Sequence, residues 1–319
     1  MNQASHFPTW ADIEQAAARI NPYIHRTPVL TSQAINTLAG ASLYFKCENF
    51  QKVGAFKIRG AMNAIFSMGQ DEISKGVATH SSGNHAQAVA LGAKTRGTKA
   101  WIVMPSTAPE VKKAAVLGYG AEVITCEPTL EARESTLKSV VADTGAQFIH
   151  PFDDWRVITG QATAAKELIE EVETLDALIA PVGGGGLLSG TALSTHYLLP
   201  EAHVYAGEPT GADDAARSFQ AGRIIPSTQP QTLADGLLTS ISEKTFAVIQ
   251  HHVKNIFTVS DEEIVAAMRM IWERMKIIIE PSCAVPFAAV LQQKEQFAGQ
   301  RIGIILTGGN VDLGKLPFK

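Results

Sequence analysis

Lys57 lies between Phe56 and Ile58, shortly after a glycine, in the segment QKVGAFKIRG (51–60). Most lysines keep the ammonium group in water and lay only the aliphatic stem against the protein. A lysine that is partly withdrawn from water has a lowered pKa, and its neutral amine condenses with an aldehyde. The position of Lys57 therefore predicts covalent chemistry with a ligand that carries an aldehyde.

Gly183, Gly184, Gly185 and Gly186 form an unbroken run inside APVGGGGLLSG (180–190), between a strand-like and a helix-like stretch. Without Cβ atoms, their backbone N–H groups can converge on one anion at the start of a helix, where the helix dipole also favours negative charge. A tight turn needs only one or two glycines, and each additional one costs backbone entropy. The run therefore predicts a phosphate-binding loop.

Two further loops place polar groups where strands are expected to end. In THSSGNHAQAVA, the hydroxyls of Ser81 and Ser82 and the amide of Asn84 come at the start of a helix, where they can grip a carboxylate or simply cap the helix. In ILTGGNVDL, Thr307 is followed by two glycines that allow a ligand to approach closely. We expect these loops at the carboxyl edge of a sheet, where open α/β proteins bind their ligands.

A Schiff-base lysine, a phosphate loop, a carboxylate grip and a lone hydroxyl together describe a site for pyridoxal 5′-phosphate. The competing hypothesis is a nicotinamide dinucleotide, whose phosphate loop follows a GxGxxG pattern. Counted from Gly183 or Gly184, the sixth residue is Leu188 or Ser189, so this pattern is not met. Glu208 follows at about the spacing of a ribose-binding acid, which keeps the dinucleotide as an alternative.

Short apolar runs alternate with helical patterns along the chain, which favours parallel strands joined by crossover helices. Several runs are almost continuously apolar, as in strands that are buried on both faces. An amphipathic helix is expected to start near Trp10. Strands are predicted at 42–49, 76–80, 99–105, 121–127, 176–182, 203–208 and 301–308, and helices at 60–68, 84–95, 108–118, 129–144, 157–172, 187–198 and 261–275.

The predicted fold is α/β, with two open, twisted, mostly parallel sheets flanked by helices in a large and a small lobe. A strand–helix–strand–helix block predicts a small domain at 71–148, and residues 1–70 and 149–319 together form a discontinuous large, cofactor-binding domain. The chain has no repeat of fixed period and no low-complexity linker. Because it ends soon after its last predicted strand, we expect no appended regulatory domain.

Composition narrows the class of protein. Apolar residues make up 45% and charged residues 18%, which is typical of a globular protein. The net charge of −4 argues against nucleic acid and anionic lipid as partners, and no apolar run is long enough for a membrane span. Cys47, Cys126 and Cys283 lie far apart and offer neither a disulfide framework nor a CxxC metal site. We expect a reduced, cytoplasmic protein without a signal peptide.

The chain resembles the serine/threonine dehydratase and serine racemase family, which are pyridoxal phosphate enzymes of fold type II (the β-family). The resemblance covers nearly the whole sequence and is greatest for serine racemase-like members without a regulatory domain. The stretches that carry it are RTPVLTS (26–32), FKCENFQKVGAFKIRGA (45–61), SSGNH (81–85), PVGGGGLLSG (181–190), EPTGADDA (208–215), IEPSCAV (279–285) and LTGGNVD (306–312).

The resemblance implies roles for individual residues. Lys57 would hold the cofactor as a Schiff base and later move the substrate α-proton, and Ser82 would supply the acid/base that a racemase needs on the opposite face. Phe56 would pack against the cofactor ring, Asn84 would bind its 3-hydroxyl, and Thr307 would contact the pyridine nitrogen. A hydroxyl there leaves the ring a weaker electron sink than an acid would, which suits prompt loss of a β-substituent. The other implied contacts are Gly183, Gly184, Gly185, Gly186, Leu187, Gly236 and Glu280 for the cofactor, and Ser81, Ser82, Asn84, His85 and Arg133 for the substrate.

The segment EPTGADD also matches the divalent-cation site of serine racemase-like members. Glu208 and Asp214 would supply carboxylates and Ala212 a backbone carbonyl to Mg²⁺, or to Ca²⁺ or Mn²⁺ in a looser shell. The alternative is a loop of solvated acids. The resemblance also implies a homodimer.

Some positions depart from the family pattern. Many relatives have serine where this chain has Ala55, and GQGT where it has GQAT (160–163). Val53 replaces a threonine that some racemases place near a nucleotide site, and Gln33 replaces a serine. We therefore do not expect activation by ATP. Because no regulatory domain is expected, we do not expect feedback inhibition by isoleucine either.

The leading hypothesis is an ammonia-lyase that dehydrates L-threonine or L-serine, a small-molecule substrate, to a 2-oxo acid and ammonia. A 3-hydroxyaspartate dehydratase and a serine racemase are alternatives that share this machinery. Hydroxyaspartate requires a cation for its second carboxylate, for which Arg133 and Arg156 are the candidates. A non-catalytic binding protein on the same fold is the distant alternative, against which the presence of Lys57 argues.

Overall fold

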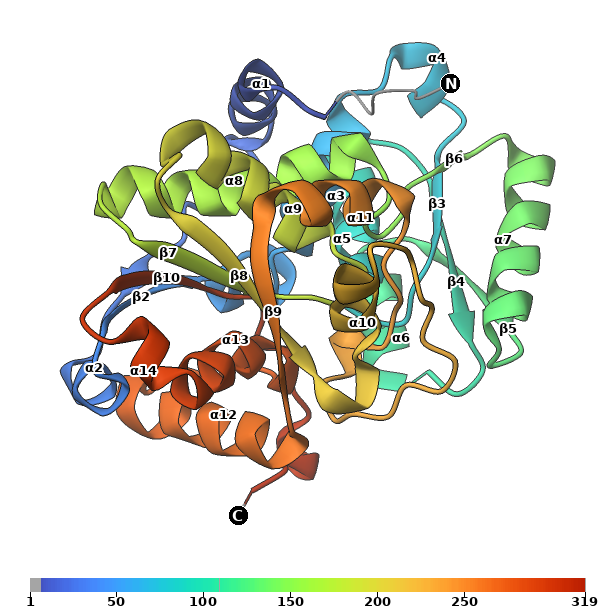
Figure 1. The fold of residues 1–319 in the computed structure, drawn as a ribbon. Coiled ribbons are helices and arrows are strands. Elements are labelled where there is room, and N and C mark those ends of the chain that lie inside the picture. Colours follow the sequence, from blue (N-terminus) through green and yellow to red (C-terminus); the bar gives the residue numbers. More distant parts are fainter. Residues whose placement is uncertain (1–6, 109, 319) are drawn as a thin grey trace.

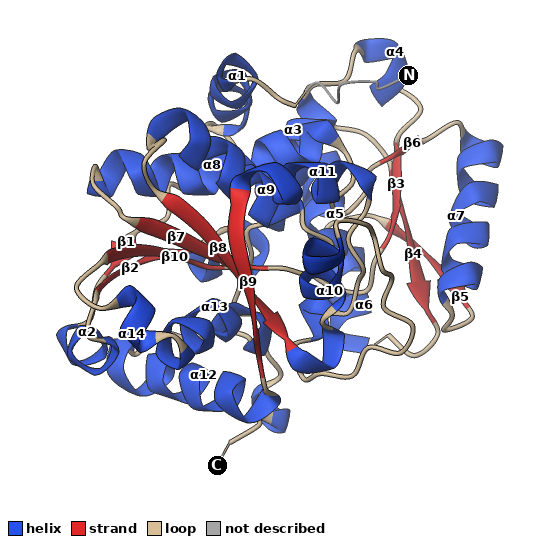
Figure 2. Cartoon of the chain, viewed as in Figure 1, coloured by secondary structure: helices blue, strands red, loops and turns tan. Residues whose placement is uncertain are grey.

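Two separate sheets form the frame of the computed structural model, which describes residues 7–108 and 110–318 (Figure 1, Figure 2). The larger sheet has six strands in the order β1-β2-β10-β7-β8-β9, and all neighbours are parallel except β1 and β2. The smaller sheet has four parallel strands in the order β5-β4-β3-β6. The strands are β1 Val29–Leu30, β2 Ser42–Cys47, β3 Val77–His80, β4 Ala100–Pro105, β5 Glu122–Cys126, β6 Gln147–Phe148, β7 Ala177–Pro181, β8 His203–Pro209, β9 Val253–Val259 and β10 Arg301–Leu306.

Helices connect and cover these strands. They are α1 Trp10–Ile20, α2 Gln33–Ala39, α3 Lys57–Phe66, α4 Gln70–Ile73, α5 Asn84–Arg96, α6 Glu110–Gly118, α7 Leu130–Thr144, α8 Trp155–Val172, α9 Gly186–Leu198, α10 Asp214–Ala221, α11 Glu243–His252, α12 Asp261–Met275, α13 Pro281–Gln292 and α14 Lys294–Phe297. Within the described residues, none of them combines the length and the apolar composition needed to cross a bilayer.

The larger sheet is buried on both faces. Every residue of its central strand β7 is buried, which agrees with the continuous apolar run of its sequence. One apolar cluster joins this sheet to α2, α12 and α13, and a second joins the other face to α1, α8 and α9 (Figure 1). The site at the end of these strands is therefore supported by a rigid, three-layered body.

The fold class predicted from the sequence is confirmed, and the two mostly parallel sheets are flanked by helices. Each predicted strand and helix exists within a few residues of its predicted bounds, including α1 at Trp10. All strands of the smaller sheet lie between residues 77 and 148, and those of the larger sheet come from both flanking stretches. The domain boundaries at residues 70 and 148 remain a prediction.

Other elements were not predicted from the sequence. Strand β9 is interrupted by Lys254 and Asn255, which an edge strand tolerates because one of its sides is unpaired. Helix α13 is apolar all round and contains Pro286, so it lacks the amphipathic periodicity of a surface helix. Strands β1 and β6 have only two residues each. The remaining elements missed were α2, α4, α10, α11 and α14.

Candidate active site

Lys57 is the first residue of α3 and is held by distant parts of the chain. The backbone N–H of Phe56 donates to the carbonyl oxygen of Thr307 at 3.0 Å, which fastens the start of α3 to the end of β10. The Nζ atom of Lys57 donates to the carbonyl oxygen of Pro151 at 2.9 Å and lies 5.3 Å from the centre of the Phe56 ring. The amine therefore has a defined position at the carboxyl edge of the larger sheet.

The environment of Lys57 favours the neutral amine. Burial lowers the pKa of Lys57 to about 8, and the nearby carboxylate of Glu280 partly opposes this effect. A lysine in water at neutral pH is almost wholly protonated and is therefore a poor nucleophile. In this site a substantial share of the amine is free to react near physiological pH.

The glycine run forms an open cradle at the start of α9. Gly183, Gly184, Gly185 and Gly186 are buried, and among the described residues their backbone N–H groups find no hydrogen-bond acceptor. Gly185 caps α9 with a φ of 85°, a left-handed conformation that favours glycine. These N–H groups converge at a helix N-terminus and can bind an anion such as phosphate.

Close packing explains why side chains are excluded from this loop. A Cβ atom at Gly184 would lie 2.2 Å from the ring of Phe152, and one at Gly183 would lie 2.9 Å from the Cα of Leu237. Phe152 thus packs directly against the cradle. The absence of side chains therefore lets neighbouring residues pack directly against the backbone of the loop.

Thr307 provides a buried hydroxyl that has no partner. Its side chain is 3% exposed, and Oγ1 forms no hydrogen bond with any described residue. A buried hydroxyl without a partner destabilises the folded protein unless a ligand or water satisfies it. Thr307 follows β10 directly, so this hydroxyl lies at the same carboxyl edge as the start of α3.

Asn84 and Glu280 form a polar pair beside Lys57. The Nδ2 atom of Asn84, at the start of α5, donates to both carboxylate oxygens of Glu280, at 3.0 and 3.3 Å. Burial raises the pKa of Glu280 to about 7, and the charge of Asp235 acts in the same direction. Glu280 therefore changes protonation near neutral pH, close to the pKa of Lys57.

The other implied cofactor contacts lie around the same edge. Leu187 is the second residue of α9 and is buried. The backbone N–H of Gly236 donates to Oγ of Ser282 at 3.0 Å, and the carbonyl oxygen of Gly236 approaches Gly183. Gly236 thus lies between the glycine cradle and the first turn of α13, where Ser282 follows Glu280 by two residues.

The loop before α5 presents groups suited to a carboxylate. Gly83 caps α5 without a side-chain hydrogen bond, which leaves the N–H groups of the first turn available. Ser81 Oγ accepts only the N–H of Gly83, at 3.3 Å, and Ser82 lies between them. His85 is buried, with Nε2 against the carbonyl oxygen of Ile149 at 3.0 Å and Nδ1 without a partner among the described residues. Burial lowers the pKa of His85 to about 3, so the imidazole is neutral.

The two candidate arginines differ in their surroundings. Arg156 forms a salt bridge with Asp154, whose Oδ2 lies 2.7 Å from Nη2, so its charge is already neutralised. Arg133 donates from Nε only to the carbonyl oxygen of Thr129, at 3.3 Å, and forms no ion pair within the described ranges. Burial and the charge of Arg133 both lower the pKa of His80, which ends β3 directly before the serine loop. Arg133 is therefore the free cation near this loop.

Sequence reasoning missed the segment HPF (150–152). The Nδ1 atom of His150 accepts the N–H groups of Phe152 and Asp153, at 3.2 and 2.8 Å, and burial lowers the pKa of His150 to about 4. Pro151 binds Lys57, and Phe152 packs on the glycine cradle. The position of this segment directly after a strand of the smaller sheet could have marked it as a ligand-binding loop. That strand, β6, has only two residues and is too short to be recognised from sequence.

The comparison with known families decides between the cofactors. A family model described as pyridoxal-phosphate dependent enzyme matches residues 20–308. The chain belongs to this family. It is 53% identical to β-hydroxyaspartate dehydratase of Paracoccus denitrificans, over 98% of this chain and 99% of that protein. It is 49% identical to L-threo-3-hydroxyaspartate ammonia-lyase of Saccharomyces cerevisiae, over 96% of this chain and 94% of that protein.

A solved structure of a related enzyme is also similar to this chain in both sequence and fold. The crystal structure of serine racemase from Dictyostelium discoideum has a TM-score of 0.92 and 53% identity, and covers 96% of this chain and 99% of that one. The relatives of this pyridoxal-phosphate dependent enzyme thus include both lyases and racemases.

The residues present fit pyridoxal phosphate. The unpaired N–H groups of Gly183 to Gly186 suit the phosphate, the depressed pKa of Lys57 suits the aldehyde, and the orphaned Thr307 hydroxyl suits the pyridine nitrogen. These groups lie on separate loops at one edge of the larger sheet. Among the described residues, the glycine N–H groups and the Thr307 hydroxyl lack partners that the cofactor could provide.

The acids of the predicted metal site are buried rather than solvated. Glu208 accepts the N–H groups of Ala215 and Ala216 at 2.9 and 2.8 Å, and Asp214 accepts the N–H of Ile241 at 3.1 Å. Burial raises the pKa of Glu208 to about 8 and that of Asp214 to about 6. Neither carboxylate forms an ion pair with a described residue, and the charge of Arg217 only partly offsets the raised pKa of Asp214, so the two acids suit a divalent cation. The described residues contain no cluster of three or more histidines, cysteines and acids, so a cation would also need backbone and water ligands.

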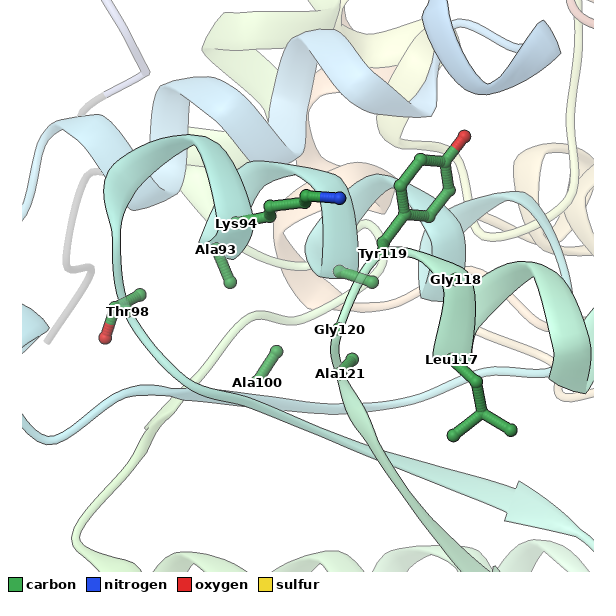
Figure 3. Close-up of a pocket in the computed structure, with 10 residues that line it drawn as sticks. Ala93, Lys94, Thr98, Ala100, Leu117, Gly118, Tyr119, Gly120 and Ala121 are labelled. Atoms are coloured by element: carbon green, nitrogen blue, oxygen red, sulfur yellow. The ribbon is translucent and has the colours of Figure 1, made fainter.

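A cavity of about 340 Å³ lies elsewhere in the molecule, between the end of α5 and the turn Leu117–Ala121 (Figure 3). It is at the amino ends of β4 and β5, whereas the loops of the site follow the carboxyl ends of their strands. Its lining is mostly small and apolar, and its one charged side chain, Lys94, is exposed. We therefore do not assign the chemistry to this cavity.

Proposed function

We propose that the protein is a pyridoxal phosphate-dependent ammonia-lyase that prefers 3-hydroxyaspartate and converts it to a 2-oxo acid and ammonia. The observation that carries this choice over L-threonine and L-serine is the unpaired guanidinium of Arg133 beside the loop that follows β3. The names of two relatives, a β-hydroxyaspartate dehydratase and an L-threo-3-hydroxyaspartate ammonia-lyase, support the same choice.

In this proposal Lys57 moves the substrate α-proton. Bound pyridoxal phosphate supplies the sink for the electron pair that remains at Cα. The neutral Nζ of Lys57 accepts the proton, since its pKa of about 8 places it near the protonation state that a general base needs. The hydrogen bond to Pro151 holds Nζ in one direction. Hydroxide then leaves Cβ and takes up the proton that Lys57 received, so that it departs as water, and the released enamine reacts with water to give the 2-oxo acid and ammonia.

The α-carboxylate of the substrate binds at the start of α5. The N–H groups of the first turn and the hydroxyls of Ser81 and Ser82 provide uncharged donors, and the helix dipole favours the negative charge. The neutral imidazole of His85 lines this site without adding charge. Of the two candidate arginines, Arg133 is the one without an ion pair among the described residues, and it would pair with a second carboxylate, which threonine and serine lack.

Mg²⁺ would be held by Glu208, Asp214 and the backbone carbonyl of Ala212, with water completing the shell. Glu208 ends β8, and Asp214 starts α10 after a short connection. A cation bound there would hold this connection against the larger sheet. We assign this cation a structural role, because both acids accept hydrogen bonds from backbone N–H groups. None of these hydrogen bonds comes from a residue that takes part in the proposed chemistry.

The test compares 2-oxo acid release from the stereoisomers of 3-hydroxyaspartate, L-threonine and L-serine, with Mg²⁺ present. We expect Arg133→Gln to lower kcat/KM for hydroxyaspartate about 100-fold, as for the loss of a charged hydrogen-bonded pair, and to change the value for L-serine by less than about threefold. Arg156→Gln is the matched control, because Asp154 already neutralises that arginine.

Serine racemase is the remaining alternative, and the same assay measures D-serine formed from L-serine. Turnover to D-serine that exceeds all 2-oxo acid release would contradict the lyase. A preference for L-threonine or L-serine that Arg133→Gln leaves unchanged would contradict the choice of hydroxyaspartate and retain the lyase.

A further inference from the structure

Asn310 connects three parts of the site and has no role in the reaction proposed above. Its Nδ2 atom donates to Oδ1 of Asn84 at 2.8 Å and to the carbonyl oxygen of Val53 at 2.7 Å. Its backbone N–H donates to Oε2 of Glu280 at 3.2 Å. One asparagine thus joins the turn before Lys57, the start of α5 and the start of α13.

These bonds determine the orientation of the Asn84 amide. An amide nitrogen carries two hydrogens and its oxygen only accepts, so the two ends of the group are not interchangeable. Asn310 offers a donor to Asn84, and Glu280 offers an acceptor. Asn84 must therefore point Oδ1 toward Asn310 and Nδ2 toward Glu280, and one amide hydrogen remains for a further acceptor.

The same asparagine fastens a strained turn. Val53 has a φ of 58°, which is unfavourable for a β-branched residue, and Gly54 follows with a φ of 67°. A Cβ atom at Gly54 would lie 2.6 Å from Oδ1 of Asn310, so the two residues are packed closely. Such a conformation persists only where surrounding contacts hold it. The bond from Asn310 to Val53 is such a contact, four residues before Lys57.

We propose that Asn310 is a positioning residue, which orients the Asn84 amide toward the cofactor and fixes its distance from the segment that carries Lys57. The inference rests on the proposed cofactor site. Asn310 acts on the cofactor mainly through Asn84, and through Val53 it acts on the turn before Lys57. The larger part of its contribution to cofactor binding should therefore disappear when Asn84 is removed.

The experiment is a double-mutant cycle on cofactor affinity. The dissociation constant of pyridoxal phosphate is measured by fluorescence titration of the apoprotein for wild type, Asn310→Ala, Asn84→Ala and the double variant. We expect Asn310→Ala to weaken binding about fivefold in the wild-type background, as for one lost hydrogen bond of an exposed side chain. In the Asn84→Ala background the same change should be less than about twofold.

Asn49→Ala is the matched control, because Asn49 donates only to the carbonyl oxygen of Ile278, at 3.1 Å. The dissociation constant of pyridoxal phosphate for Asn49→Ala should stay within about twofold of the wild-type value. Asn310→Asp keeps the shape of the side chain but removes both donated bonds, and it serves as the second variant if Asn310→Ala does not fold. We expect Asn310→Asp to weaken the binding of pyridoxal phosphate at least as much as Asn310→Ala does.

An equal loss with and without Asn84 would overturn the inference, because Asn310 would then act only on general stability. An unchanged affinity in Asn310→Ala and Asn310→Asp would also overturn it, while leaving the proposed lyase intact. Failure of the wild type to bind pyridoxal phosphate would overturn both.

Discussion

At the scale of single residues, the site consists of groups that the protein itself leaves unsatisfied. The hydroxyl of Thr307 and the N–H groups of the glycine cradle are buried without partners, and Arg133 has no carboxylate within the described ranges. Buried polar groups are normally paired, since an unpaired one costs about 1–3 kcal/mol. The hydroxyl and the N–H groups lie at one edge of the larger sheet, and Arg133 lies on α7, which packs on the smaller sheet; both sets of groups indicate ligands that complete them.

Lys57 yields a prediction at this scale. Because burial lowers its pKa to about 8, the fraction of neutral amine rises with pH through that value. The rate at which the apoprotein combines with pyridoxal phosphate should therefore increase about tenfold per pH unit below pH 8 and level off above it. Stopped-flow absorbance measures this rate. A rate that continued to rise toward pH 10 would show that Lys57 is not buried in solution, and Lys57→Ala should abolish the covalent species.

At the scale of elements, α3 carries Lys57 and is anchored by a buried group of charges. Arg59, two residues further on, is fully buried and donates to both carboxylate oxygens of Glu48 at 2.7 and 2.8 Å. It also binds both carboxylate oxygens of Glu167 on α8, which in turn pairs with Lys46 on β2 at 2.7 Å. This group locks α3 to α8 and to the larger sheet, and so fixes the direction in which the first turn of α3 points.

Removal of Arg59 tests this anchor. Arg59→Met leaves two buried carboxylates with one cation, so the free energy of unfolding should fall by about 3–5 kcal/mol. Urea unfolding measures the change. The matched control is Arg269→Met, which removes an exposed pair with Glu273 at the same distance of 2.7 Å and should cost less than about 0.5 kcal/mol. Similar losses for the two variants would contradict the anchoring role of the buried group.

At the scale of the whole molecule, sequence periodicity predicted the central strands because burial on both faces requires continuous apolar runs. Sequence periodicity did not predict β9, because polar residues of this edge strand interrupt its apolar run. It did not predict α13 either, because this largely buried helix is apolar on all sides and lacks a polar face. The phosphate cradle was predictable because four glycines in a row cost backbone entropy that a simple turn does not require. The roles of Pro151 and Asn310 could not be predicted from the sequence. Pro151 is 94 residues from Lys57, and Asn310 is 226 residues from Asn84 and 257 from Val53, so only the folded chain brings these partners together.

The stability of the whole molecule should depend on pH through Glu208 and Asp214. Their folded-state pKa values, about 8 and about 6, lie above the ordinary values of 4.5 and 3.8. Through these two acids the folded protein binds more protons than the unfolded chain between about pH 4 and pH 8, so their contribution to stability falls as pH rises. His85 and His150, whose pKa values burial lowers to about 3 and about 4, act in the opposite direction at acidic pH. Without divalent cations, the melting temperature of the wild type relative to that of Glu208→Gln should therefore drop by several degrees across this window.

Bound Mg²⁺ should reverse this loss, because a cation favours the ionised carboxylates and binds only the folded form. A melting scan in chelator and in Mg²⁺ at pH 8 measures the difference, which should be absent at pH 5, where both acids are protonated. Glu208→Gln should remove most of the response to Mg²⁺. Asp213→Asn is the control, since that acid already pairs with Arg217 at 2.8 Å. If Mg²⁺ leaves the melting temperature at pH 8 unchanged while the fall with pH remains, the two acids are a buried proton-binding pair and the cation site is wrong.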